Sequence, residues 1–176
     1  MKILNIVMIA ITCTMCSLAH SEDYADEAKD WGVSAMSRPK GSPYHAITPL
    51  QIPGAKLIKT DELKTLWAAT PDLAVIDVLG NAKMIKGAVG MVGSGENRMF
   101  GAMQDKFPKV LGTLTGGDKE KPIVFYCKNS MCWMSYNSAL HAVAAGFKNV
   151  YWYRGGLDSW VASSGETSGQ AVAAGW

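Results

Sequence analysis

The sequence contains few of the residues from which many functional sites are built. Only 4 of the 176 residues are cysteine and 3 are histidine, and the formal net charge is only +2. No Lys/Arg-rich run is present that would neutralise a line of phosphates, so we expect no nucleic-acid partner. The glycine-rich segment KGAVGMVGSGEN, residues 86–97, lacks the Gly-Lys-Ser/Thr ending of a phosphate-binding loop and the spacing G-x-G-x-x-G. We interpret its glycines as turn residues.

The small number of histidines and cysteines also disfavours a metal site. Such a site needs three or four ligands, and beyond residue 21 the sequence offers two cysteines with His45 and His141. Neither histidine has ligand spacing relative to the cysteines, and we interpret His141 as a helix-surface or packing residue. We therefore expect no metal and no cofactor.

The N-terminus carries the sequence's long apolar run. Lys2 precedes the apolar segment Ile3 to Leu18, and the small-x-small triplet Ala19-His20-Ser21 follows. This pattern predicts a signal peptide over residues 1–21 and a periplasmic protein with no membrane contact after cleavage. A retained anchor is the alternative, because the run is only slightly short for a membrane span. The periplasm is oxidising, which favours disulfide formation between neighbouring thiols.

The rest of the chain divides into three parts, and its apolar fraction is ample for one packed core. Residues 22–55 contain four prolines and no sustained period, which predicts an irregular lead-in that packs, if at all, through Trp31 and Tyr44 and has no chemistry of its own. Residues 164–176 are rich in Ser, Gly and Ala and predict a flexible tail. Residues 56–163 form the predicted domain.

Strand-like and helix-like segments alternate along this domain. Strands are predicted within 56–60, 73–78, 88–92, 123–127 and 149–154, and helices within 60–67, 99–114, 132–146 and 155–160. The alternation predicts a single α/β domain with a parallel sheet of about five strands flanked by helices on both faces. In such sheets ligands bind beyond the carboxyl ends of the strands.

Cys127 lies at one of these strand ends, before a predicted loop and helix. The helix N-terminus should direct free amide groups toward the loop, where they would stabilise a thiolate. Cys127 is therefore a candidate nucleophile, and the alternative is a buried, inert thiol. Lys128 either adds positive charge beside this thiol or points to solvent. We expect Asp77, at the end of an earlier strand, to orient loop amides by accepting their hydrogen bonds.

Four segments of the domain occur together in a known family. "AVIDV", "IKGAV", "IVFYC" and "GFKNVYWYRGGLDSW" follow one another between residues 56 and 162. In this they resemble the rhodanese-like sulfurtransferases. The resemblance implies a persulfide on Cys127, held by amides of an active-site loop made of Lys128, Asn129, Ser130 and Met131 with Trp133. It also implies a small sulfur donor and a thiol acceptor as partners.

Three further segments resemble a narrower group. "LTGGDKEKPIVFYC", "CWMSYN" and "NVYWY" are similar to the PQQ-dependent catabolism-associated CXXCW motif proteins. This implies a link to a periplasmic quinoprotein system for alcohol oxidation. Four residues separate Cys127 from Cys132, however, where the name of the group advertises two.

The sequence also departs from the common rhodanese pattern. Leu79 stands where an arginine is usual, and the loop has the neutral Asn129, Ser130 and Met131 where basic or glycine residues are usual. Thiosulfate, an anion, thereby loses its obvious partners. Phosphatases of this fold carry an arginine six residues after the cysteine, and that position is Trp133. Phosphatase activity is therefore disfavoured.

Cys132 is the second candidate catalytic residue. It could attack a persulfide on Cys127, release the sulfur and leave a disulfide, or it could simply pack beside Trp133. The leading hypothesis is a periplasmic sulfurtransferase that carries sulfane sulfur on Cys127. One alternative is a thiol–disulfide module in which the two cysteines exchange with a thiol oxidoreductase. Another is a non-catalytic module that docks a quinoprotein partner.

Overall fold

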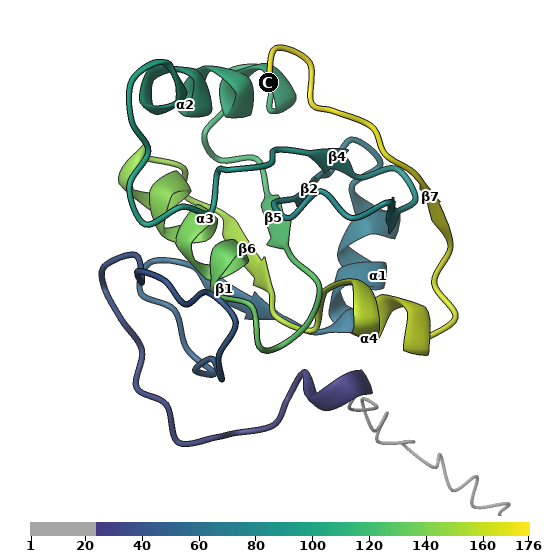
Figure 1. Cartoon of the computed structure of the whole chain (residues 1–176). Coiled ribbons are helices and arrows are strands. Elements are labelled where there is room, and N and C mark those ends of the chain that lie inside the picture. Colours follow the sequence, from purple (N-terminus) through teal and green to yellow (C-terminus); the bar gives the residue numbers. More distant parts are fainter. Residues whose placement is uncertain (1–23) are drawn as a thin grey trace, which may run out of the picture.

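A computed structural model describes residues 24–176. Its centre is a five-stranded parallel sheet in the order β1-β6-β5-β2-β4 (Figure 1). The strands are β1 (Lys56–Ile58), β2 (Ala74–Asp77), β4 (Val89–Gly90), β5 (Ile123–Tyr126) and β6 (Val150–Tyr153). The helices are α1 (Thr60–Ala69), α2 (Ala102–Leu114), α3 (Trp133–Ala144) and α4 (Gly156–Ala162). The predicted α/β fold is confirmed, whereas the predicted signal peptide lies outside the described residues.

Alternating side chains of the sheet build two separate cores. On the central strand β5, Ile123 and Phe125 pack with α2 and α3, while Val124 and Tyr126 pack on the opposite face with α1 and α4. All four side chains are fully buried. Figure 1 shows the same division, with α2 and α3 on one side of the sheet and α1 and α4 on the other. A strand covered on both faces is apolar throughout, which explains the continuous run in the sequence.

The C-terminal segment forms structure where a flexible tail was expected. Strand β7 (Thr167–Gly169) pairs antiparallel with β3 (Lys83–Ile85), and neither strand was predicted. Farther along, Ala173 is 2% exposed and its N–H donates to the Gly90 carbonyl at 3.0 Å. The chain then ends beside α2 (Figure 1), where the Trp176 ring packs edge-on against Phe107. The composition of this segment predicts no core of its own, but its contacts with β3, β4 and α2 fix it on the domain.

In the described part of the lead-in, residues 24–55, the one named element is a 3-10 turn, η1 (Tyr24–Asp26), yet this segment is anchored to the domain. Glu27, which is 1% exposed, accepts hydrogen bonds from the N–H and the hydroxyl of Thr60 at the start of α1. A carboxylate is favoured there by the helix dipole. Arg154, just after β6 and equally buried, donates to the carbonyl oxygens of Asp26, Glu27 and Thr48. The irregular segment is therefore a fixed part of the structure.

Candidate functional site

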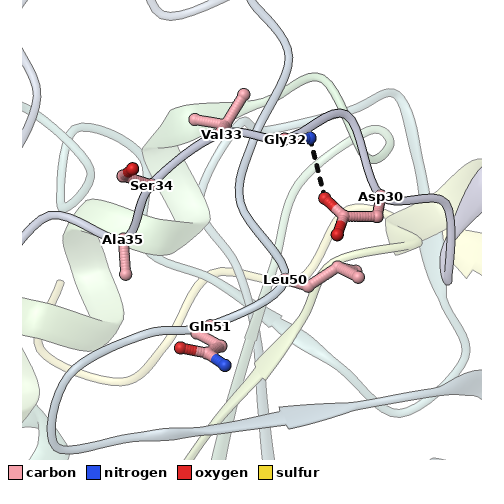
Figure 2. A pocket seen from close by; sticks show the side chains of 7 residues that line it. All are labelled: Asp30, Gly32, Val33, Ser34, Ala35, Leu50 and Gln51. Atoms are coloured by element: carbon pink, nitrogen blue, oxygen red, sulfur yellow. Dashed lines mark hydrogen bonds between the residues drawn. The ribbon is translucent and has the colours of Figure 1, made fainter.

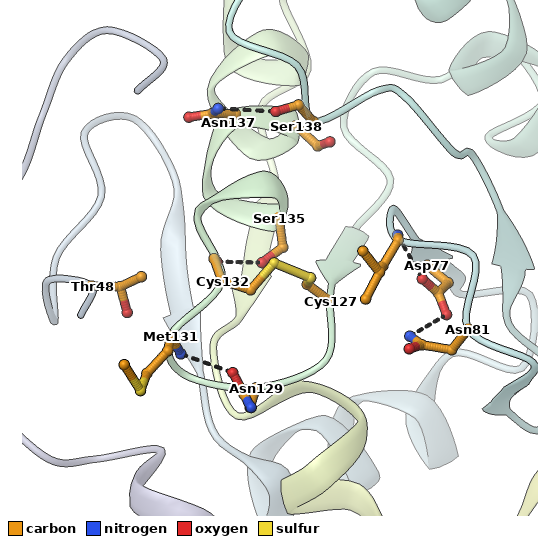
Figure 3. Close-up of a disulfide and its surroundings, with 12 residues drawn as sticks. Thr48, Asp77, Asn81, Cys127, Asn129, Met131, Cys132, Ser135, Asn137 and Ser138 are labelled. Atoms are coloured by element: carbon orange, nitrogen blue, oxygen red, sulfur yellow. Dashed lines mark hydrogen bonds between the residues drawn. A yellow bond between two sulfur atoms is a disulfide. The ribbon is translucent and has the colours of Figure 1, made fainter. Parts of the chain in front are cut away.

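The two cysteines meet at the carboxyl end of the sheet. Cys127 directly follows β5 and is 1% exposed, and Cys132 caps the N-terminus of α3 and is 8% exposed. Their sulfurs form a disulfide that closes the loop of residues 128–131 (Figure 3). The structure thus brings together both predicted catalytic residues. It also makes Cys132 the more accessible half of the pair.

The first residues of α4 are hydrogen-bonded to the backbone of Cys127 and of the loop. The N–H of Leu157 donates to the Cys127 carbonyl at 3.0 Å, and the N–H of Asp158 donates to the Lys128 carbonyl at 2.8 Å. This close approach requires Gly156, whose φ is +60° and whose position leaves no room for a side chain. A Cβ there would lie 2.5 Å from the Cys127 carbonyl oxygen. Gly156 therefore allows the start of α4 to fix the backbone at Cys127.

The lead-in holds the loop from the other side. His45 and Cys132 form an isolated antiparallel β-bridge, flanked by hydrogen bonds from Ala46 N–H to the Met131 carbonyl and from Trp133 N–H to the Tyr44 carbonyl, each 2.9 Å. We call this pairing the lead-in bridge. The sequence interpretation missed it and assigned the lead-in no chemistry. The only signal was the short β-compatible run YHAIT between two prolines.

Two further contacts fix the lead-in bridge. The Thr48 hydroxyl donates to the Ser130 carbonyl, and the indole N–H of Trp133 donates to the Ile47 carbonyl at 3.1 Å. Thr48 is in turn held by Arg154, which donates to its hydroxyl at 2.9 Å and to its carbonyl at 3.1 Å. Thr48 and Ser130 are both buried. The segment beside the cysteines is therefore rigidly connected to the domain.

The backbone amides of the loop differ from the expected arrangement. The N–H of Met131 donates to the side-chain oxygen of Asn129, the N–H of Cys132 donates to the Asn129 carbonyl, and the N–H of Trp133 donates to Tyr44. Three donors expected to face the sulfur of Cys127 thus have other acceptors. For Trp133 the acceptor comes from the lead-in, and for Met131 and Cys132 it is Asn129 of the loop itself.

The polar side chains of the loop turn toward α4. The Lys128 ammonium lies 3.2 Å from Asp158, and the Asn129 amide donates to the other carboxylate oxygen of Asp158 at 3.0 Å. The Lys128–Asp158 pair is well exposed, so its contribution to stability is small. Both side chains therefore connect the loop to α4.

Asp77 ends β2 and is fully buried. One of its carboxylate oxygens accepts the N–H groups of Leu79 and Gly80 at 2.8 and 3.0 Å, and the other accepts the Asn81 amide at 3.1 Å (Figure 3). These bonds fix the turn after β2. That turn places Leu79 at the edge of the hollow beside the disulfide.

A small hollow of about 150 Å³ opens onto the disulfide. Leu79 and Met134 give it apolar walls, and Tyr44 and His45 from the lead-in complete it with Cys127, Lys128, Asn129 and Cys132. Two main effects raise the pKa of the Tyr44 hydroxyl. The larger is its partial burial, and the smaller is its hydrogen bond to Glu96. A thiol or small persulfide fits the apolar walls better than a multiply charged anion does.

Other parts of the described chain offer less chemistry. A larger hollow of about 440 Å³ lies within the lead-in, where the Asp30 carboxylate accepts the Gly32 N–H (Figure 2). Asp30 is the one ionisable residue that lines it. Within residues 24–176 no group of three His, Cys, Asp or Glu side chains is placed to hold a metal ion. No helix in the same range is long and apolar enough to cross a membrane.

Comparisons with known proteins agree with this architecture. Residues 59–163 match the model of the rhodanese-like domain. A thiosulfate sulfurtransferase from Pseudomonas aeruginosa is similar in structure, with a TM-score of 0.50, 16% identity and coverage of 66% of this chain. The match spans only 21% of the Pseudomonas chain. A homodimeric polysulfide-sulfur transferase from Wolinella succinogenes has a TM-score of 0.47 and 22% identity, with 65% of this chain and 79% of that chain covered.

No curated protein matches the chain. The family match nevertheless covers well over half of the sequence, from the residue before α1 to the residue after α4. It includes the strand end that bears Cys127, the loop and the start of α3. This chain belongs to the rhodanese-like domain family.

Proposed function

We propose that this protein is a periplasmic sulfurtransferase in which Cys127 takes up a sulfane sulfur as a persulfide and Cys132 releases it. The observation that carries the proposal is the bond between the two sulfurs at the strand end. Because Cys132 reaches the sulfur of Cys127, it also reaches a persulfide built on that atom. The predicted leader and the oxidising compartment it implies support the periplasmic location.

Loading transfers one sulfur atom. The Cys127 thiolate attacks the sulfane sulfur of a donor R–S–SH, a new S–S bond forms on Cys127, and the thiol R–SH leaves. The apolar hollow and the neutral loop favour such a persulfide donor over thiosulfate. Thiosulfate would load the same residue with sulfite as the leaving group.

Release forms the disulfide seen in the structure. The Cys132 thiolate attacks the Cys127 sulfur of the persulfide, and the outer sulfur leaves as hydrosulfide, which takes up a proton to become hydrogen sulfide. The sulfane sulfur is reduced, and the two cysteines are oxidised to the disulfide. A dithiol oxidoreductase must then reduce the pair, which makes such a protein an expected partner.

A second candidate function is thiol–disulfide exchange without a persulfide. It is favoured by the loop amides, because three of them donate to protein acceptors rather than to a sulfur carried on Cys127. In that case Cys127 and Cys132 would only cycle between dithiol and disulfide. The link to a quinoprotein system rests on the resemblance of residues 114–127, 132–137 and 149–153 to the PQQ-associated group.

Trapping the persulfide separates these functions. Reduced Cys132→Ser protein is incubated with a reactive persulfide or with thiosulfate, and the modified residue is located by intact mass and peptide mapping. We expect a gain of one sulfur on Cys127 that persists because the resolving thiol is absent. The Cys127→Ser protein is the matched control and should gain none. If Cys132→Ser gains no sulfur from either donor while the wild-type pair still cycles with a dithiol reductant, sulfurtransfer is excluded and thiol–disulfide exchange remains.

A further inference from the structure

His45 lies directly opposite Cys132 in the lead-in bridge. The two flanking hydrogen bonds join their neighbours, Ala46 to Met131 and Trp133 to Tyr44, so His45 and Cys132 form a non-hydrogen-bonded antiparallel pair. In such a pair the two side chains project from the same face, and their backbones approach to about 4.5 Å. The Cβ atoms of His45 and Cys132 are therefore neighbours on that face, about 4.5–5.5 Å apart.

The hollow at the disulfide shows that these side chains share one space. His45, Cys127 and Cys132 all line it, and His45 is also exposed to solvent. A protein imidazole accepts and releases protons near neutral pH. His45 can therefore pass a proton between the site and water.

Other ionisable groups around the hollow already have partners. On the lead-in, the Tyr44 hydroxyl bonds Glu96 and the Lys40 ammonium bonds two lead-in carbonyls. On the loop, Lys128 pairs with Asp158, and after β2 the carboxylate of Asp77 accepts three donors. His141, farther along α3, contacts the Glu96 carbonyl. Of the histidines that the structure describes, His45 is the one that lines this hollow.

Contacts of the neighbouring residue Thr48 fix the backbone near His45. Three residues later, Thr48 bonds the Ser130 carbonyl of the loop and is held by the buried Arg154. The lead-in also lies before residue 59, where the match to the rhodanese-like domain begins. This chain thus adds a residue to its cysteine pair from outside the matched segment.

We propose that His45 is the proton acceptor for Cys132. The inference rests on the proposed function and names the group that activates its releasing step. His45 takes the proton of the Cys132 thiol, the thiolate attacks the Cys127 sulfur of the persulfide, and the departing hydrosulfide takes the proton from the imidazolium to leave as hydrogen sulfide. When a dithiol later reduces the disulfide, its two thiols supply the two protons that the cysteines take up, and His45 passes one of them to Cys132.

Titration of the Cys132 thiol tests this pairing. The full chain carrying Cys127→Ser is titrated by the ultraviolet absorbance of its thiolate, and the Cys127→Ser/Cys132→Ser chain is the blank, so that the difference reports Cys132 alone. We expect a pKa below the ordinary cysteine value of about 8.5, and His45→Gln should raise it by about one unit. His141→Gln is the matched control and should leave it unchanged.

Measuring the pKa of His45 as well distinguishes a direct interaction with Cys132 from a structural effect of the substitution. The pKa of the His45 imidazole, followed by NMR, should be higher in Cys127→Ser than in the double variant, because a neighbouring thiolate stabilises the imidazolium. If His45→Gln leaves the Cys132 titration unchanged, or if the His45 titration is the same with and without Cys132, the pairing is wrong.

The kinetics separate this inference from the proposed function. In the His45→Gln protein, persulfide loading on Cys127 should be unchanged, whereas the release of hydrogen sulfide at pH 7 should fall. A rise of one unit in the thiol pKa lowers the thiolate fraction at pH 7 about eightfold, and the difference should nearly vanish by about pH 9. If Cys132→Ser takes up no sulfur while the titrations show that His45 and Cys132 are coupled, the sulfurtransferase is overturned and the pairing stands. Normal loading without that coupling would overturn the role of His45 alone.

Discussion

Replacement of Arg154 by methionine should release the lead-in and destabilise the protein. The guanidinium is 1% exposed and donates four hydrogen bonds, to the hydroxyl and carbonyl of Thr48 and to the carbonyls of Asp26 and Glu27. It also stacks on Trp31 at 4.5 Å from the ring centre. Methionine fills a similar volume but offers no donor. The substitution therefore removes the polar connection between β6 and the lead-in.

The expected loss can be worked out from these contacts. Each hydrogen bond contributes about 1 kcal/mol net, and the acceptors left behind are partly buried, so we expect unfolding free energy to fall by about 3–4 kcal/mol. For a chain of this size that corresponds to a melting temperature lower by about 10 °C. Arg38→Met, at an exposed position of the same lead-in, should change stability by less than about 0.5 kcal/mol.

Thermal and urea unfolding of the oxidised proteins provide the measurement. Limited proteolysis should in addition cut Arg154→Met within residues 28–48 faster than it cuts Arg38→Met, since the anchor at Thr48 is lost. An Arg154→Met protein that melts within about 2 °C of wild type, with an equally resistant lead-in, would show that the segment is held by other contacts and would refute this reasoning.

Two further predictions concern the glycines and the buried tyrosines. Gly156→Ala should destabilise the protein by at least about 2 kcal/mol in urea unfolding, because a Cβ would meet the Cys127 carbonyl at 2.5 Å on a backbone with φ of +60°. Gly112→Ala, in α2 with no atom within 4 Å of the added carbon, should instead stabilise by about 0.5–1 kcal/mol; equal effects would contradict the proposed crowding at Gly156. Burial, and then the charge of Asp77, raises the pKa of Tyr126 far above its ordinary value. Its contribution to stability is therefore complete below the unfolded pKa of about 10 and is lost as pH rises above it, so Tyr126→Phe should flatten the fall in melting temperature between pH 9 and 11. An equally steep fall in the variant would exclude Tyr126 as its source.

The sheet and the place of the cysteine pair could be predicted from the amino-acid order. Apolar runs such as residues 73–78 and 123–127 belong to strands covered on both faces, and the helical periods between them require a parallel sheet. The carboxyl ends of parallel strands form one edge, so the position of Cys127 at that edge was predictable. Asp77 was predictable on the same ground, because the acid ends a buried strand. The family resemblance was carried by these same segments.

The surroundings of that pair became visible only in the folded chain. His45 meets Cys132 across 86 intervening residues, and Thr48 meets Arg154 across more than 100. The tail likewise pairs with β3 and β4 through its backbone. The pairing of His45 and the pairing of the tail are made by N–H and C=O groups that nearly every residue carries, and the contact of Thr48 with Arg154 joins two common polar side chains. Neither kind of contact imposes a period or a composition on the sequence. The partners of the irregular segments could therefore not be predicted from the sequence. The position of His45 opposite Cys132 became known only from the tertiary structure.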